Sequence, residues 1–279
     1  MLKLDTPEID PVRFYNICIS RSTPASKKER LENSKECVEA SCTNYRQKAE
    51  AGELFEYRRV GGAEATDVEL YKVYDSGTRK NGPGRDTYDA LILSAPRGQC
   101  VLCFQRDADA LDHYLPRSAY QELSVAPDNL IPVCSKCNGR AAKGTHVPSE
   151  YTDQLLHPYF DDFTEERWLF AEAFLVTGET TITLRIETPE GWSEESEERL
   201  KFHFEKLGLW KLYAVNAASL VQTIIDTLDA ANLTNDFAVR QFLEQLGQKF
   251  HRRRPNCWEA AVYFALADFD PFIESVTNN

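Results

Sequence analysis

The sequence lacks the features of a secreted or membrane-spanning protein. Its first residues, MLKLDTPEIDPVRFYN, contain no basic stretch followed by an apolar run, so no secretory signal is expected. No window contains the roughly 18 uninterrupted apolar residues of a membrane span. Four of the eight cysteines stand singly and form no framework of pairs that would indicate disulfides: Cys18, Cys37, Cys42 and Cys257. These absences predict a cytoplasmic protein with no membrane partner.

The sequence also lacks the motifs of several common enzyme classes. It contains no Gly-x4-Gly-Lys-Ser/Thr phosphate loop, no Gly-x-Ser-x-Gly nucleophile turn and no His-Glu-x2-His metal motif. It has no internal repeats and no low-complexity tracts. With 279 residues, of which 42% are hydrophobic and 27% charged, the chain has enough apolar material for the core of one or two globular domains.

The chain has a deficit of positive charge. Its net charge is −12 and its isoelectric point is near 5.0, whereas the phosphates of nucleic acids are bound best by lysine and arginine. The stretch 134–146 is an exception, because it carries Lys136, Arg140 and Lys143 and no acidic residue. The sequence therefore predicts a local basic patch on an acidic protein. The acidity itself indicates narrow substrate choice, a partner that brings the substrate, or simply solubility.

Two Cys-x2-Cys pairs frame the most informative stretch of the chain. They are Cys100 with Cys103 and Cys134 with Cys137. Each pair can direct two thiolates at one point, and two pairs make the four-sulfur set that structural zinc takes. Disulfides and unrelated buried thiols are the alternatives. A reducing cytoplasm disfavours the first and the paired spacing disfavours the second, so the sequence predicts a structural zinc site.

Chemically suggestive residues lie between and just behind the cysteine pairs. They are Asp112-His113, Asn129-Leu130, Asn138 and Lys143-Gly144. In this order and spacing, the segment resembles the zinc-bound form of the HNH endonuclease family. The resemblance implies that two short strands and a helix fold around one catalytic metal ion.

The resemblance assigns a role to each matching residue. His113 corresponds to the general base that takes a proton from the attacking water, and Asp112 and Asn138 correspond to oxygen ligands of the catalytic metal. Asn129 corresponds to the residue that orients the histidine ring and steadies its loop. A neutral imidazole, with an ordinary pKa of about 6.5, can accept a proton from water near pH 7. A divalent ion held by few protein oxygens keeps coordination positions open for a phosphate.

Asn138 departs from the many family members that have histidine at this place. An all-oxygen ligand set favours Mg²⁺ or Mn²⁺ over a second zinc. Neighbours in a regular strand face opposite sides, so Asp112 and His113 can serve one site only if the backbone bends, as the following Pro116 would allow. Taken singly, His113 fits a hydrogen-bonded core histidine, Asn129 a turn former and Asn138 a helix cap.

The predicted reaction is metal-dependent hydrolysis of a phosphodiester bond, with Lys143 and Arg140 holding neighbouring phosphates. One such site cuts one strand, so a monomer is expected to nick. A double-strand break would need a dimer or two encounters. The resemblance implies DNA as a more usual substrate than RNA. The competing hypotheses are a zinc-stapled module that binds nucleic acid or protein without cutting it, and an RNA-cleaving HNH nuclease active only in complex with a partner.

The element His157-Pro158-Tyr159-Phe160 follows the motif. It extends the resemblance to HNH proteins of bacterial anti-phage defence systems, some of which work beside an ATPase subunit. The resemblance therefore implies a role as a defence effector with an ATPase or other partner protein. His157 itself fits a structural histidine in an aromatic cluster, and an approach to the active site or a phosphate is the alternative.

Helical patterns precede the motif. The stretch Pro24 to Gly52 predicts a helix with Leu31, Val38 and Tyr45 at heptad spacing as a packing seam. Two shorter helices are expected over residues 67–74 and 86–94. Between them, residues 77–85 predict a flexible basic loop, which is either a solvated connection or a phosphate-contacting arm.

After the motif, the pattern predicts a β-hairpin and then helices. Residues 168–176 and 180–187 alternate around a turn at 177–179. Helices are expected over 193–208, 210–231, 235–250 and 257–267, the first capped by Ser193. The basic run 249–255 either complements a helix C-terminus or contacts nucleic acid.

These patterns together predict an α+β protein of three parts. Residues 1–95 form an N-terminal helical segment, residues 96–162 an HNH nuclease module with its structural zinc, and residues 163–279 a β-hairpin with C-terminal helices. Whether the flanks are separate domains, and whether the protein forms oligomers, stays open at this point.

Overall fold

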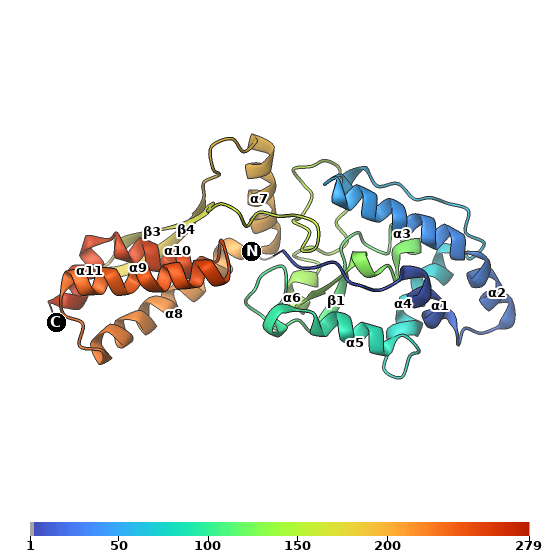
Figure 1. Ribbon diagram of the computed structural model, residues 1–279, viewed down its shortest axis with the longest axis horizontal. Coiled ribbons are helices and arrows are strands. Elements are labelled where there is room, and N and C mark those ends of the chain that lie inside the picture. The colour runs from blue at the N-terminus through green and yellow to red at the C-terminus, as the bar shows by residue number, and fades with distance from the viewer. Residues whose placement is uncertain (1–2, 279) are drawn as a thin grey trace. The chain divides into compact units, whose positions relative to one another are not determined.

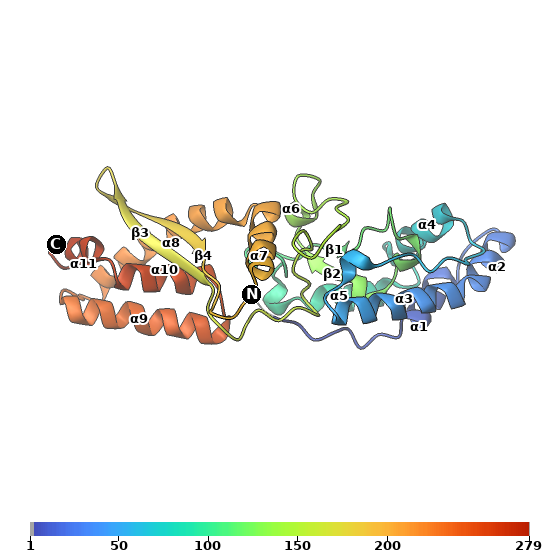
Figure 2. The same ribbon diagram turned by 90° about the horizontal axis from the view of Figure 1, so that it is seen from above.

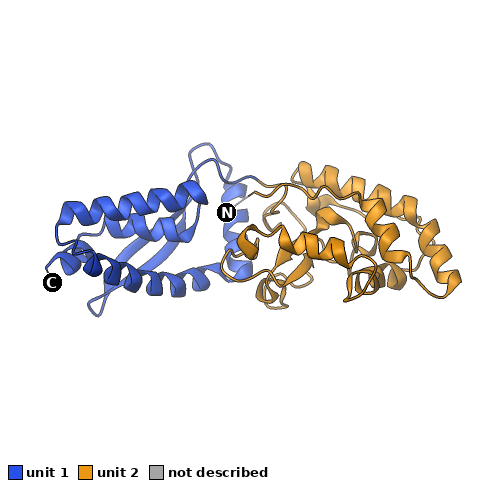
Figure 3. Ribbon diagram, turned by 60° about the horizontal axis from the view of Figure 1, so that its bottom comes forward, with its two compact units in different colours: residues 1–2, 162–279 blue, residues 3–161 orange. Residues whose placement is uncertain are grey.

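The computed structural model describes residues 3–278, which divide into two compact units (Figure 3). The N-terminal unit spans Lys3–Asp161 and the C-terminal unit runs from Asp162. The described residues contain helices and two separate two-stranded antiparallel sheets, which confirms the α+β class. The N-terminal unit combines the expected helical segment with the stretch expected to be the nuclease module. None of the helices in residues 3–278 is long and apolar enough to cross a membrane.

Five α-helices precede the cysteine motif in the described part of the N-terminal unit (Figure 1): α1 (Pro11–Ile19), α2 (Ala25–Asn33), α3 (Lys35–Glu50), α4 (Asp67–Thr78) and α5 (Arg85–Leu93). The single helix predicted over Pro24 to Gly52 is therefore divided at Ser34. The buried Ser34 hydroxyl donates to the Arg30 carbonyl at 2.7 Å and accepts from the Ala65 amide at 2.8 Å, so it ties the break to a distant loop.

The predicted packing seam of this helical stretch is confirmed. Leu31, Val38 and Tyr45 are each no more than 1% exposed. Gly52 takes a positive φ of 73° just behind α3, where a residue without Cβ carries no steric cost.

Helix α1 has no counterpart among the predicted elements. Asp10 caps it by accepting from the Arg13 amide at 2.6 Å, and proline occupies its first turn. The loop predicted to be flexible packs against this helix, because a Cβ at Gly77 would lie 2.6 Å from that of Cys18 and one at Gly84 would lie 2.7 Å from its sulfur. Close approach to α1, rather than flexibility, therefore explains these glycines.

The cysteine motif folds into a small hairpin followed by a single helical turn. Strand β1 (Ala110–His113) pairs antiparallel with β2 (Leu130–Val133), so that Asp112 lies opposite Ile131 and His113 opposite Leu130. Helix α6 (Ser135–Asn138) follows at once. Helix α5 packs on both strands, and α3 and α4 pack on the short 3₁₀ helix η3 (Gln121–Leu123) in the connection.

The C-terminal unit is built on a longer hairpin, as the sequence predicts. Strands β3 (Leu169–Val176) and β4 (Glu179–Ile186) pair along their whole length, and the two-residue turn at Thr177 and Gly178 has the positive φ values of 52° and 87° that a tight hairpin needs. Figure 2 shows the hairpin beside α8 and α10, with α10 in contact with β3 and α8 with β4.

Five helices complete the C-terminal unit: α7 (Glu194–Leu207), α8 (Leu209–Ala230), α9 (Asp236–Arg253), α10 (Trp258–Ala267) and α11 (Asp270–Thr277). The first four match predicted helices, and α11 has no predicted counterpart. Ser193 caps α7 by accepting from the Ser196 amide at 3.2 Å, as expected. The basic run 249–255 includes the last turn of α9. Just beyond the helix, the buried Arg254 pairs with Glu259.

Candidate metal centre and active-site pocket

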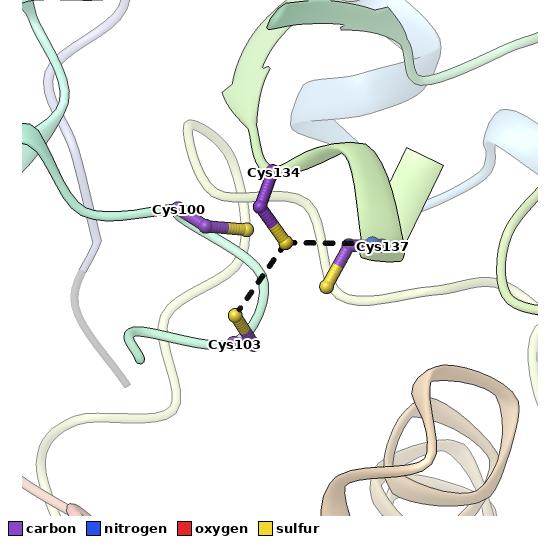
Figure 4. Close-up of side chains that lie close together, drawn as sticks. All are labelled: Cys100, Cys103, Cys134 and Cys137. Carbon is purple, nitrogen blue, oxygen red and sulfur yellow. Dashed lines mark hydrogen bonds between the residues drawn. The ribbon is translucent and has the colours of Figure 1, made fainter. Parts of the chain in front are cut away.

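The four motif cysteines come together as one buried cluster (Figure 4). Their sulfur atoms all lie within 4.8 Å of one another, and the Sγ atoms of Cys103 and Cys134 are 3.9 Å apart. Tetrahedral zinc with Zn–S bonds of about 2.3 Å places its sulfur ligands about 3.8 Å apart. The four residues thus fit a structural zinc ion, and the predicted structural metal site is confirmed at the level of its ligands.

Local backbone geometry directs these thiols. Cys100 accepts at its carbonyl from the Phe104 amide at 2.8 Å, and Phe104 takes a positive φ of 50° that closes the first turn. Cys134 lies at the start of α6, where its sulfur accepts from the Cys137 amide at 3.4 Å. Hydrogen bonds from neighbouring thiols, that of Cys100 first, lower the pKa of Cys134 well below its usual range and that of Cys103 to about 6. The same thiol hydrogen bonds raise the pKa values of Cys100 and Cys137, so two of the four sulfurs favour the thiolate form that binds a cation.

His113 is the last residue of β1 and is 6% exposed. Its Nε2 lies 2.8 Å from the Ser124 carbonyl oxygen, and its ring meets the edge of Tyr74 at 4.7 Å between centroids. A carbonyl can only accept, so Nε2 carries the proton and Nδ1 is left as the acceptor. Burial lowers the pKa of His113 to about 3, so the ring is neutral at pH 7. This is the tautomer that a histidine acting as a base through Nδ1 requires.

Asp112 is 5% exposed and forms an ion pair with Lys143, whose Nζ lies 2.9 Å from Oδ2. Burial raises the pKa of Asp112, and the ammonium of Lys143 opposes the rise. The same ammonium donates to the His113 carbonyl at 2.6 Å. Lys143 was expected to contact a phosphate, but it is only 2% exposed and its ammonium contacts Asp112 and His113 instead.

A pocket of about 370 Å³ brings Asp112, His113 and Asn138 together. Both neighbours border this cavity, although they are consecutive residues of the paired strand β1. Asn138, at the end of α6, is half-buried. A carboxylate and a carboxamide are hard oxygen donors that suit Mg²⁺ or Mn²⁺, so the chemistry of the donors fits such an ion, which would still need most of its ligands from water or a phosphate.

Asn129 is fully buried and clasps the loop that follows β1. Its Oδ1 accepts from the Leu115 amide at 2.7 Å, and its Nδ2 donates to the carbonyls of Leu115 at 3.0 Å and Leu123 at 3.5 Å. This loop also carries the Ser124 carbonyl that holds His113. Asn129 therefore steadies the loop directly and bears on the histidine ring only through it.

The other two expected contacts lie outside the pocket lining. Arg140 is exposed, beyond the end of α6. His157 is 1% exposed, lies 2.9 Å from the Tyr45 hydroxyl through Nε2, and is surrounded by aromatic rings, with the Tyr114 centroid at 4.2 Å. Its interpretation as a structural histidine in an aromatic cluster is confirmed.

Sequence reasoning missed one wall of the pocket. Tyr71 and Tyr74, one turn apart on α4, line it together with Arg117. The Arg117 guanidinium lies 4.1 Å from the Tyr71 ring centroid and 4.8 Å from that of Tyr74, and it pairs with Asp75 at 2.9 Å. No pattern in the sequence shows that α4 packs beside β1.

Comparisons with known proteins give two similarities. The chain is 28% identical to the protein Ea31 of Escherichia phage lambda, across 83% of this chain and 85% of that protein. It is 31% identical to the Septu protein PtuB of Bacillus thuringiensis over 83 residues, which are 28% of this chain and 31% of that protein. No protein-family model matches the sequence, and no solved structure is significantly similar.

Proposed function

We propose that this protein is a metal-dependent HNH endonuclease that hydrolyses phosphodiester bonds in the pocket formed by Asp112, His113 and Asn138. One observation carries the proposal. The hydrogen bond from His113 Nε2 to the Ser124 carbonyl leaves Nδ1 as the proton acceptor of a residue that lines a pocket together with Asp112 and Asn138. The motif resemblance and the four-cysteine cluster agree with it.

The roles of the residues follow from this arrangement. His113 Nδ1 accepts a proton from the water that attacks phosphorus. Asp112 and Asn138 would hold a divalent ion, which supplies stabilisation of the negative charge that develops on the phosphate. The Ser124 carbonyl fixes the tautomer of His113 and stabilises the imidazolium that forms. The four cysteines would hold a zinc ion that stabilises the position of α6, and with it Asn138, beside β1.

A nucleic acid is the substrate class that fits this pocket. Arg117 provides a cation at the pocket wall whose orientation is fixed by two tyrosine rings, and Arg140 lies exposed beyond α6. Both suit contact with phosphates that flank the cleaved bond. We propose DNA as the substrate and a single-strand nick as the product, because one site cleaves one strand.

We further propose that the nuclease is an effector of a bacterial anti-phage defence system and acts with a partner protein such as an ATPase. The similarity to the Septu protein PtuB supports this proposal over the 83 matched residues. The similarity to the phage lambda protein Ea31 is longer, but the name of that protein indicates no function.

A plasmid-nicking assay with Mg²⁺ or Mn²⁺ tests the proposed activity. The wild-type chain is expected to convert supercoiled plasmid to the open-circular form, and His113→Ala to lose this activity at equal zinc content. His146→Ala is the matched control, because it removes a histidine of the same segment that does not line the pocket. Equal nicking by wild type and His113→Ala rejects the proposal. If the isolated chain is silent, the assay is repeated with a candidate partner protein added.

A further inference from the structure

Lys143 connects the zinc cluster to the Asp-His dipeptide. Its amide donates to the Cys137 carbonyl at 3.2 Å, and its ammonium reaches the Asp112 carboxylate at 2.9 Å and the His113 carbonyl at 2.6 Å. A lysine ammonium that is 98% buried is uncommon and costs free energy unless it is paired. This ammonium thus sits against the one carboxylate to which the proposed function assigns a divalent ion.

The negative charge of Asp112, the charged member of the proposed ligand pair, is nearly cancelled by neighbouring positive charge. Among the described residues that line it, Asp112 is the only acid. Asn138 is uncharged, the His113 ring is held by the Ser124 carbonyl, and Arg117 is a second cation that pairs with Asp75. With the Lys143 ammonium 2.9 Å from Asp112, the oxygen ligands present no net negative charge to an incoming ion.

We propose that Lys143 keeps this site too poor in negative charge to bind Mg²⁺ or Mn²⁺ firmly by itself, so that the ion is loaded together with a nucleic-acid phosphate. The inference rests on the proposed nuclease function and adds the order in which the site is filled. Hard divalent ions in phosphate-transfer sites take few carboxylates and complete their shells with water and substrate phosphate. The phosphodiester supplies the missing negative charge and draws the ion to Asp112 and Asn138. Lys143 acts through Asp112 and is a positioning residue.

Thermodynamic reciprocity makes the proposal measurable from either side. If nucleic acid strengthens the binding of the ion, the ion must strengthen the binding of nucleic acid by the same factor. Removal of the Lys143 charge should raise the ion's affinity for the protein alone and reduce the gain from nucleic acid.

The test measures Mn²⁺ binding by the zinc-loaded full-length chain, from the electron paramagnetic resonance signal of free Mn²⁺. A His113→Ala background prevents cleavage and retains the backbone carbonyl that Lys143 contacts. Titrations are made without nucleic acid, with a short DNA duplex and with an RNA duplex of the same sequence. We expect Mn²⁺ to bind at least ~10-fold more tightly with one of the duplexes present.

Three variants in the same background isolate the charge of Lys143. Lys143→Met removes both charge and hydrogen bond, and Lys143→Gln removes the charge but keeps a donor for the His113 carbonyl. Both should bind Mn²⁺ at least ~10-fold more tightly than their parent without nucleic acid. Lys136→Met is the matched control, because it removes an exposed positive charge from the preceding helix α6 and should leave Mn²⁺ affinity unchanged. Zinc content and melting temperature verify the fold, and Lys143→Gln carries the test if Lys143→Met does not fold.

Two results overturn the proposal. One is an equal Mn²⁺ affinity with and without both duplexes, and the other is the absence of any gain in Lys143→Gln. Neither result affects the nuclease function if the wild-type chain still nicks plasmid in a His113-dependent manner. Failure of the nuclease function appears instead as equal plasmid conversion by wild type and His113→Ala.

Discussion

The two units of the chain differ in charge. Residues 162–279 contain 20 acidic and 11 basic side chains, whereas residues 1–161 contain 24 and 21. The C-terminal unit therefore holds most of the net charge of −12, and the unit with the candidate pocket is nearly balanced. Net charge of a whole chain is thus a poor guide to nucleic-acid binding when the acidity belongs to another unit.

The units also differ in how their hairpins are stabilised. Strands β3 and β4 have eight residues each and are packed by α8 and α10. Strands β1 and β2 have only four residues each and are followed by a four-residue helix. So short a hairpin has little intrinsic stability. Metal binding by the cysteine cluster beside it is expected to contribute further stability. Because all four tryptophans lie in the C-terminal unit, tryptophan fluorescence reports on that unit alone.

Loss of the metal should have the largest effect and should separate the units. Cys134→Ser, or a strong chelator, is expected to remove one zinc per chain and to expose the amides of residues 100–145 to hydrogen exchange. Structural zinc contributes about 10 kcal/mol or more in small zinc-dependent folds. Tryptophan fluorescence should not change.

Cys42→Ser is the control, since it alters a buried cysteine of the same unit outside the cluster. Zinc retention in Cys134→Ser, or equal loss of exchange protection in both units, would contradict the distinction between the two hairpins.

Loss of the proposed base should be the next largest effect, and it concerns activity alone. His113→Gln is expected to reduce nicking at least ~100-fold, because a glutamine can donate to the Ser124 carbonyl but cannot act as a base. Zinc content and exchange protection should stay at wild-type levels. Full activity in this variant would remove His113 from the mechanism.

A substitution at Asn256 should destabilise the C-terminal unit and leave the N-terminal unit unchanged. Its side chain accepts from the Trp168 amide at 2.8 Å and donates to the carbonyls of Phe163 at 3.0 Å and Glu166 at 2.8 Å. Asn256→Ala should lower the free energy of unfolding by about 3 kcal/mol, because buried backbone groups lose their partners. Urea unfolding followed by tryptophan fluorescence measures the change.

Asn232→Ala is the control for Asn256→Ala, since Asn232 has a similar positive φ of 51° and is exposed. Zinc content and nicking should be unaffected by either substitution. A loss of zinc in Asn256→Ala would show that the two units are not independent.

The smallest expected effect is a dependence of stability on pH that belongs to His113. Its pKa is about 3 in the folded chain and about 6.5 when unfolded, so the unfolded chain binds a proton first as the pH falls. Stability is complete above pH 6.5 and declines from there toward pH 3. Between pH 7 and pH 5.5, wild type should lose about 1 kcal/mol more than His113→Gln. Hydrogen exchange of the N-terminal unit measures this loss of stability. An equal loss in wild type and His113→Gln would contradict a buried neutral ring.

The sequence was most informative where a local pattern determines the structure. Cysteine spacing predicted the metal cluster, strand alternation predicted the β3–β4 hairpin, and heptad spacing predicted the seam of Leu31, Val38 and Tyr45. Helix α1 was missed although Asp10 and Pro11 form a recognisable start signal.

Features that depend on distant contacts could not be predicted. The tyrosine wall of the pocket depends on how α4 packs beside β1, and the break at Ser34 depends on the amide of Ala65. Lys143 looked like a surface cation in a basic stretch. Its burial follows from the turn after α6, which directs the side chain at Asp112 and His113.

The central claim is that a zinc-held hairpin presents His113 to a phosphodiester. Sequencing of nucleic-acid ends from cells that produce either wild type or His113→Ala at equal levels tests it most directly. The account predicts new cleavage ends with wild type that are absent with His113→Ala. The same ends from both proteins, or no new ends under any condition in which the chain accumulates with its zinc, would contradict it.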